Sequence, residues 1–148
     1  MVRDPTRDAD GEVVPHDHPD IRDDDYVIRH IPPAMLVPAD NSKPLGPRRI
    51  SSGAYSESGD FPFGMSVDIE GWIVAAGLSP LHYLPDPSYG AQRLNVGALR
   101  RAGCQVGWDP IPGKNPHHAL VWGLRNSKTM RKQVARLAIT LKKAAGEA

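Results

Sequence analysis

The sequence lacks the features that mark several large protein classes. Cys104 is its only cysteine among 148 residues, so no internal disulfide can form, which favours a reducing compartment. No apolar run approaches the roughly 20 residues that are needed to span a bilayer. The acidic, proline-bearing N-terminus does not resemble a signal or transit peptide. We therefore expect a cytoplasmic protein without a membrane partner.

The sequence also lacks the motifs that would identify a cofactor. It contains no Cys-x-x-Cys, His-Glu-x-x-His, Walker A or Gly-x-Gly-x-x-Gly pattern. The tract His16-Asp17-His18 with Asp20 offers metal ligands, but a single flexible tract rarely holds zinc without a further fixed ligand. Cys104 lies in an apolar segment, which is typical of a packing residue rather than a nucleophile. We predict no metal site, and the cofactor is left unknown.

Turn-forming residues and acidic residues are abundant, by contrast. The chain has 15 prolines and 14 glycines, which favour many turns and short elements, and its length fits one domain. Residues 1–25 hold nine acidic side chains against three arginines and few apolar ones. Such a segment buries too little surface to offset its ordering entropy. We divide the chain into an acidic polar N-terminal arm, residues 1–25, and a single compact α+β domain, residues 26–148.

Hydrophobic patterns predict the elements of that domain. β-rich runs at 26–31, 104–108 and 118–123 are typical of strands. A short helix is expected from Ile69 to Ala76 with Asp68 as its N-cap, and another over 96–102 that ends at Gly103. Residues 128–145 contain no proline or glycine and carry an apolar stripe at helical spacing. The predicted fold is α+β: a small mixed or antiparallel sheet, two short helices and a long C-terminal helix.

Arginines and hydroxyls that could hold an anion gather in one part of the sequence. The segment from Arg48 to Ser56 brings together arginine, serine and glycine, and Arg29 lies in the first predicted strand. Guanidinium can grip phosphate with two hydrogen bonds, and hydroxyls can add further ones. The alternative is that the arginines are solvated and the serines only shape a turn. The candidate ligand-binding residues are Arg29, Arg49, Ser51, Ser52 and Ser66.

Two further residues are candidates for proton transfer. His118 begins a predicted strand, and its imidazole titrates near neutral pH, as a general acid or base requires. His117 is its neighbour and should point to the opposite face, so His118 is preferred. Asp68 follows Ser66 and offers a carboxylate. The alternative for His118 is a loop histidine bonded to the backbone.

The chain resembles a group of small uncharacterised bacterial proteins. The resemblance covers roughly residues 26–140. It rests on Arg49-Ile50-Ser51-Ser52-Gly53-Ala54-Tyr55, then Ser66-Val67-Asp68, then Asn115-Pro116-His117-His118-Ala119. It implies a bacterial source and supplies no activity.

A second part of the pattern is similar to ADP-ribosyltransferase folds and their NAD-degrading relatives. Those proteins hold NAD with an early arginine or histidine and a serine strand that ends in an aromatic residue, as Arg29 and the Ser51-Ser52 segment suggest here. They usually present a late catalytic glutamate. The matching late strand of this chain carries His118 and no acid, and Glu70 is the only nearby substitute. The resemblance implies a nucleotide ligand such as NAD.

Two classes of function remain open at this stage. The first is a small enzyme or ligand-binding domain for a phosphate-bearing nucleotide, with the residues above as its site. The second is a noncatalytic interaction module of a larger bacterial complex, with the acidic arm as its docking element. Residues 125–148 carry seven basic side chains against one acidic, so nucleic acid is a further candidate partner, through the basic C-terminal helix. Whether the chain is an enzyme is not decided by its sequence.

Overall fold

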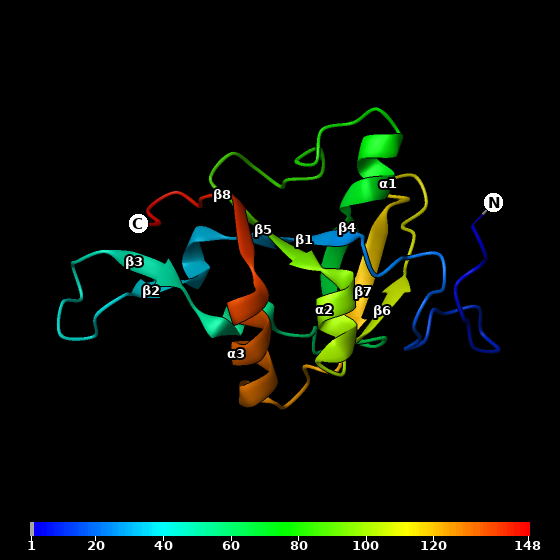
Figure 1. Cartoon of the computed structure of the whole chain (residues 1–148), viewed down its shortest axis with the longest axis horizontal. Coiled ribbons are helices and arrows are strands. Elements are labelled where there is room, and N and C mark those ends of the chain that lie inside the picture. Colours follow the sequence, from blue (N-terminus) through cyan, green and yellow to red (C-terminus); the bar gives the residue numbers. More distant parts are fainter. Residues whose placement is uncertain (1) are drawn as a thin grey trace.

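The computed structural model describes residues 2–148 and is built on one antiparallel sheet. Its six strands lie in the order β6-β7-β4-β1-β5-β8, and β2 and β3 form a separate hairpin. The strands are β1 (Tyr26–Ile31), β2 (Leu36–Pro38), β3 (Arg48–Ile50), β4 (Met65–Ile69), β5 (Gly90–Asn95), β6 (Gln105–Trp108), β7 (His118–Trp122) and β8 (Ile139–Lys142). Figure 1 shows the hairpin extending away from the sheet. The α+β class and the antiparallel sheet are confirmed.

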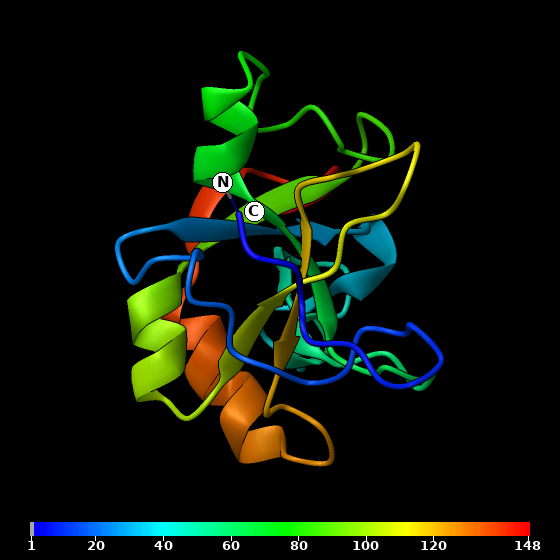
Figure 2. The same ribbon diagram turned by 90° about the vertical axis from the view of Figure 1, so that its right-hand side faces the viewer.

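Short helices accompany this sheet. In the described part of the chain the α-helices are α1 (Glu70–Ala75), α2 (Val96–Arg101) and α3 (Lys128–Leu137), and the 3-10 turns are η1 (Pro33–Met35) and η2 (Ser52–Tyr55). In Figures 1 and 2, α2 and α3 lie below β1, whereas α1 lies above it. No helix within residues 2–148 is long and apolar enough to cross a bilayer.

The predicted long C-terminal helix is wrong. Helix α3 ends at Leu137, and Ala138 adopts extended dihedrals of φ −69° and ψ 137°. The next residues form β8, which pairs with the edge of β5, for example Thr140 with Gln92. β-branched Ile139 and Thr140 suit a strand, and the free edge of β5 offers backbone hydrogen bonds that a longer helix would leave unused. Lys142 and Lys143 are therefore not on a basic helix.

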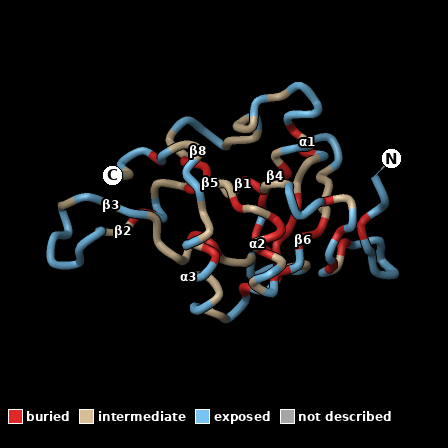
Figure 3. The backbone as a smooth tube through the Cα atoms, viewed as in Figure 1, coloured by how far each residue is buried: buried red, intermediate tan, exposed pale blue. Residues whose placement is uncertain are grey.

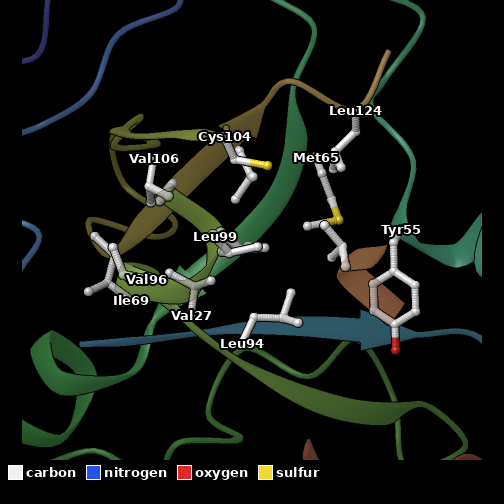
Figure 4. Packing of buried hydrophobic residues seen from close by; sticks show 14 of the residues in the cluster. Val27, Tyr55, Met65, Ile69, Leu94, Val96, Leu99, Cys104, Val106 and Leu124 are labelled. Atoms are coloured by element: carbon white, nitrogen blue, oxygen red, sulfur yellow. The ribbon is translucent and has the colours of Figure 1, made fainter. Parts of the chain in front are cut away.

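The main core lies between the sheet and the pair α2 and α3. Val27 and Leu94 face each other across β1 and β5, and Leu99 and Val96 reach them from α2 (Figure 4). In Figure 3 the buried residues are concentrated on the central strands, while the loop that connects β2 to β3 is largely exposed. Side chains alternate along a strand, so residues between these core positions point to the opposite face of the sheet.

The sheet consists of two three-stranded halves that meet at a short joint. Strands β1 and β4 pair only at Val27 with Ile69 and Ile28 with Asp68, whereas all six residues of β1 pair with β5. Beyond Ile28, β1 and β4 form no further residue pairs, and the side chain of Arg29 connects the two strands instead. Its Nη1 donates to Ser66 O at 2.9 Å, and its Nε donates to Ala54 O at 2.9 Å. A guanidinium thus replaces the missing strand hydrogen bonds.

The acidic arm is packed on the body. Ile21 is fully buried, and His18 is 1% exposed. Arg100 of α2 fastens the arm by donating to Asp17 at 2.9 Å, to Asp23 at 2.7 Å and to His18 O at 2.9 Å. Burial of apolar and aromatic groups at a few positions thus offsets the ordering entropy that the acidic composition suggested would prevail.

Candidate functional site

Three strands place Asp68 next to two histidines. Asp68 and His118 are direct partners in the pairing of β4 with β7, and Asp68 is also the partner of Ile28 in β1. Directly opposed residues share a face of the sheet, and His30 lies two residues beyond Ile28 on that same face. His30, Asp68 and His118 therefore form a row across the sheet, on the face opposite the main core.

The carboxylate of Asp68 is buried and only half satisfied. Asp68 is 3% exposed, and its Oδ1 accepts a hydrogen bond from Asn115 Nδ2 at 2.7 Å. Its Oδ2 has no hydrogen-bond partner, although His30 Nε2 lies 3.3 Å away and is itself unpartnered. An unsatisfied buried carboxylate is costly, so this pair is a feature that packing alone does not explain.

Burial sets the acidity of this pair. It raises the pKa of Asp68, and it lowers the pKa of His30, because the charged form of each is poorly solvated. The attraction between carboxylate and imidazolium acts against burial in both cases. Two adjacent sites with these opposing shifts can share one proton, which is the property of a general base that must accept a proton and return it.

His118 has the opposite tendency. Its Nδ1 lies 2.9 Å from Asp109 O and 3.1 Å from Asp109 Oδ2. A carbonyl oxygen only accepts, so Nδ1 carries the proton. Burial lowers the pKa of His118, but the hydrogen bonds and the charge of Asp109 outweigh it and raise that pKa above its usual value. The imidazolium is favoured, and within residues 2–148 no hydrogen bond to its Nε2 is formed.

Arg29 adds a positive charge beside this row. It follows Ile28 on the core side of β1, and its charge lowers the pKa of the neighbouring His30. No carboxylate among residues 2–148 pairs with Arg29, and burial lowers its own pKa. The guanidinium borders a cavity of about 250 Å³ that is also lined by Gly53, Ser56 and Ser66. A half-buried guanidinium that forms no ion pair and lies next to hydroxyls is suited to an anion.

The structure brings together some of the sequence-predicted site residues and separates others. Ser66 is exposed, shares its sheet face with Asp68, and lines the cavity of Arg29. Arg49 is exposed and lines a different cavity of about 270 Å³ together with Gln92 and Glu147. Arg29 and His118 leave the sheet on opposite faces, so the expected convergence of Arg29, Ser52 and His118 on one spot does not occur.

The serines of η2 have a local task. Ser51 caps η2, and its Oγ accepts from Gly53 N at 3.1 Å. Ser52 is half-buried in η2.

Asp68 is not the helix cap that the sequence suggested: it lies in β4, and Ile69 occupies the N-cap position of α1 without a side-chain bond. Glu70 is bound to Arg93 at 2.8 Å, and Arg93 is the β5 partner of Ile28, on the same sheet face as the row.

The metal-ligand tract of the arm is occupied by hydrogen bonds. His16 Nδ1 contacts Val14 O at 2.7 Å, and His16 Nε2 accepts from Trp108 N at 3.2 Å. His18 bonds to Arg3 O through Nε2 at 2.8 Å. No cluster of three or more histidine, cysteine, aspartate or glutamate residues within residues 2–148 has metal-binding geometry.

Sequence reasoning missed His30, Asp109 and the direct role of Asn115. The signal for His30 was present, because alternation in the predicted strand 26–31 puts it on the face opposite Arg29. The contact of Asp109 depends on the bend between β6 and β7, which no local pattern reveals. Strands β4 and β5 were not predicted, so the pairing that aligns Asp68 with His118 was not predictable either.

Comparisons of this chain with protein-family models, with curated proteins and with solved structures found no match. The site's own geometry indicates its chemistry: a carboxylate–imidazole pair that can share a proton, a histidine whose protonated form is more favoured than usual, and an arginine on the opposite face of the sheet.

Proposed function

We propose that this protein is an enzyme that uses the His30–Asp68 pair as a general base and His118 as a general acid on a phosphate-bearing nucleotide. The observation that supports this most is the unsatisfied Oδ2 of buried Asp68, 3.3 Å from the equally unsatisfied His30 Nε2. Groups with perturbed acidity concentrate at catalytic sites because proton transfer needs pKa values matched to the working pH.

The proton balance of such a reaction follows from the geometry. The His30–Asp68 pair takes a proton from the attacking group, and His118 gives one from Nε2 to the leaving group. The enzyme then carries the same number of protons as before, and solvent resets the two sites. Arg29 supports the substrate class, because its unpaired charge beside the cavity attracts a phosphate.

Turnover assays on NAD, ATP and short oligonucleotides test this proposal, with products followed by chromatography and phosphorus NMR. We expect Asp68→Asn and His118→Gln each to lower kcat by about 100-fold or more, the usual contribution of a positioned acid or base. Arg49→Ala is the matched control, because Arg49 lines another cavity. We expect a bell-shaped pH profile, limited on the acid side by the pair and on the basic side by His118.

Two results would reject the proposal in different ways. Full turnover by Asp68→Asn would reject the assigned site. No turnover and no calorimetric binding of any of these nucleotides by the wild-type protein would reject the substrate class.

A noncatalytic interaction module is the second candidate function, and the β2–β3 hairpin favours it. Leu45, in the loop between β2 and β3, is fully exposed and would be accessible to a partner chain. The arm is less suited to docking than expected, because Arg100 holds it against the body. Leu45→Asp should then abolish co-purification of a defined partner without lowering the unfolding midpoint. Unchanged co-purification would reject the hairpin as a docking element.

A further inference from the structure

Two cavities lie on either side of the segment Ser56–Ser58 and share its three residues as lining. The first, of about 250 Å³, is the cavity beside Arg29 and Ser66. The second, of about 310 Å³, is bordered by Arg125 and Arg131. Both are lined by the residues 56–58, so a ligand in one can continue into the other across this segment. We call this feature the serine groove.

The serine groove carries net positive charge. Arg29, Arg125 and Arg131 form no ion pair with any carboxylate in residues 2–148. The one acid in the lining, Glu57, is outnumbered by the three arginines and is hydrogen-bonded to backbone donors: its Oε1 accepts from Gly64 N at 3.0 Å. Its Oε2 accepts from three successive amides of the turn after β7, at 2.9, 2.8 and 3.1 Å. These bonds also fix segment 56–58 between the two cavities.

An exposed aromatic side chain lies on the loop that borders the groove. Phe61 is 54% exposed and meets Phe63 edge to face, with ring centroids 6.0 Å apart. The guanidinium of Arg125 lies 3.8 Å from the centre of the Phe63 ring. Trp122 Nε1 donates to Pro62 O at 2.9 Å and holds this loop on the sheet. The exposed ring of Phe61 is thereby presented on a fixed base.

We propose that the serine groove binds a single-stranded oligonucleotide. Cationic grooves that follow a phosphate backbone, combined with an aromatic platform for a base, are the recurrent means of holding single strands. Two arginine-bordered cavities on either side of segment 56–58 suit at least two phosphates, which a mononucleotide with one phosphate does not supply. Stacking on Phe61 requires an unpaired base, so a duplex is excluded.

The inference rests on the proposed function for its placement of the reacting nucleotide. The cavity of Arg29 includes Ser66, which shares a sheet face with Asp68 and His118. His30, Asp68 and His118 line neither cavity, so the groove would hold the strand, and Ser66 would be its point of closest approach to the row of acid–base residues. The groove determines the substrate class, and the row determines the chemistry.

Fluorescence anisotropy with labelled eight-residue oligouridylate and oligothymidylate tests the binding. We expect the double variant Arg125→Met/Arg131→Met to make the plot of log affinity against log salt shallower by about 1.4, since each phosphate contact on a single strand contributes about 0.7. Phe61→Ala should weaken binding roughly tenfold, the value of one stacked base. The double variant Arg101→Met/Lys143→Met changes the same charge outside the groove and should retain affinity. Arg29 is left intact because it also bridges β1 and β4.

Competition decides between the ligand classes. Unlabelled single strands should displace the probe, and a duplex of equal length should not. If inorganic polyphosphate displaces the probe equally well and Phe61→Ala has no effect, the oligonucleotide assignment is overturned. Equal salt slopes for the wild type and the arginine variant would show that the groove is not the binding site.

The failure of this inference differs from the failure of the proposed function. If binding depends on Phe61, Arg125 and Arg131 but no turnover occurs, the groove is retained as a binding site and the catalytic proposal is rejected. If NAD or ATP is turned over but oligonucleotides do not bind, the catalytic proposal is retained and the groove is rejected as an oligonucleotide site. Asp68→Asn should leave oligonucleotide affinity unchanged, because Asp68 lies outside the groove lining.

Discussion

At the residue scale, burial lowers the pKa of both His30 and His118, and their partners decide the direction of the net shift. His118 has a carboxylate partner in full hydrogen-bond contact, and its pKa is raised. His30 has a carboxylate nearby without a hydrogen bond, and its pKa is lowered by burial. Two histidines on one face of a sheet thus have different protonation preferences at the same pH, as an acid and a base of one reaction require.

The raised pKa of His118 makes its contribution to stability depend on pH. The contribution is fully present below the unfolded value of about 6.5 and is lost as the pH rises through the folded pKa. We expect His118→Gln to lower the free energy of unfolding by about 2 kcal/mol at pH 5.5, the magnitude of a hydrogen bond to a charged group. The difference from wild type should shrink by pH 9, as measured by urea unfolding across this range. A difference that grew with pH would contradict the assignment of Asp109 as the stabilising partner.

The sequence singled out part of this row. Asp68, His118 and Ser66 were predicted as site residues from their types, and the structure places all three on one face. The grouping with Arg49 was not reproduced, although Ala54, a few residues further along the same segment, accepts a hydrogen bond from Arg29 of the first strand. Instead, Arg49 lies in β3, which pairs with β2 in the separate hairpin.

At the element scale, one arginine connects α2 to three groups of the N-terminal arm. Arg100 binds two carboxylates and a carbonyl of the arm from the last turn of α2. Bonds from one guanidinium to several groups are more stabilising than separate surface pairs, because the side chain is ordered only once. The arm itself has no helix or strand, so this clamp and a few buried side chains define its position.

Removal of the Arg100 side chain should make the N-terminal arm mobile without unfolding the sheet. We expect Arg100→Met to increase amide hydrogen exchange of residues 13–25 by about tenfold, with a loss of about 1–3 kcal/mol in local stability. Arg101→Met, one residue away and exposed, is the matched control. Equal protection of the arm in both variants would show that buried His18 and Ile21 hold it without Arg100.

The last strand depends on a close approach at Gly90. A Cβ at this position would lie 2.6 Å from Ala144 N and 3.0 Å from Lys142 O, both backbone atoms. We expect Gly90→Val to displace β8 from the edge of β5 and to lower the free energy of unfolding by more than about 2 kcal/mol. Lost protection of residues 139–142 in hydrogen exchange would identify β8 as the affected element. Gly59→Val, where nothing lies within 4 Å, is the control.

The same region shows why the sequence misidentified an element. Residues 128–137 and 139–142 share an uninterrupted composition without glycine or proline, so local signals continue a helix through Ala138. The competing signal is the unpaired edge of β5, which is known only once β5 has been recognised. Strand β5 was missed because Gly90 to Asn95 contains glutamine, arginine and asparagine, and its apolar residues are few. Tertiary pairing therefore overrides propensity in this segment.

At the scale of the whole molecule, the single thiol reports on global unfolding. Cys104 is 5% exposed within the main core, and burial raises its pKa to about 11. The thiolate is scarce at neutral pH even when a reagent reaches it. We expect labelling of Cys104 at pH 7.5 to be at least about 1000-fold slower than in urea, since an unfolding free energy of about 5 kcal/mol or more limits access.

The urea dependence of that labelling rate provides the check. If global opening controls access, the rate should rise with urea in parallel with loss of circular dichroism. Fast labelling in the absence of urea would show that the segment around β6 opens separately from the rest of the sheet.

The short joint between β1 and β4 has a mechanical consequence. His30 belongs to one three-stranded half of the sheet, and Asp68 and His118 belong to the other. A rotation of either half about the joint changes the separation between His30 Nε2 and Asp68 Oδ2, and with it the ease with which a proton passes. Arg29 spans the same joint. A molecule bound to Arg29 would therefore change the proton affinity of the His30–Asp68 pair by moving the two halves of the sheet, without touching the pair.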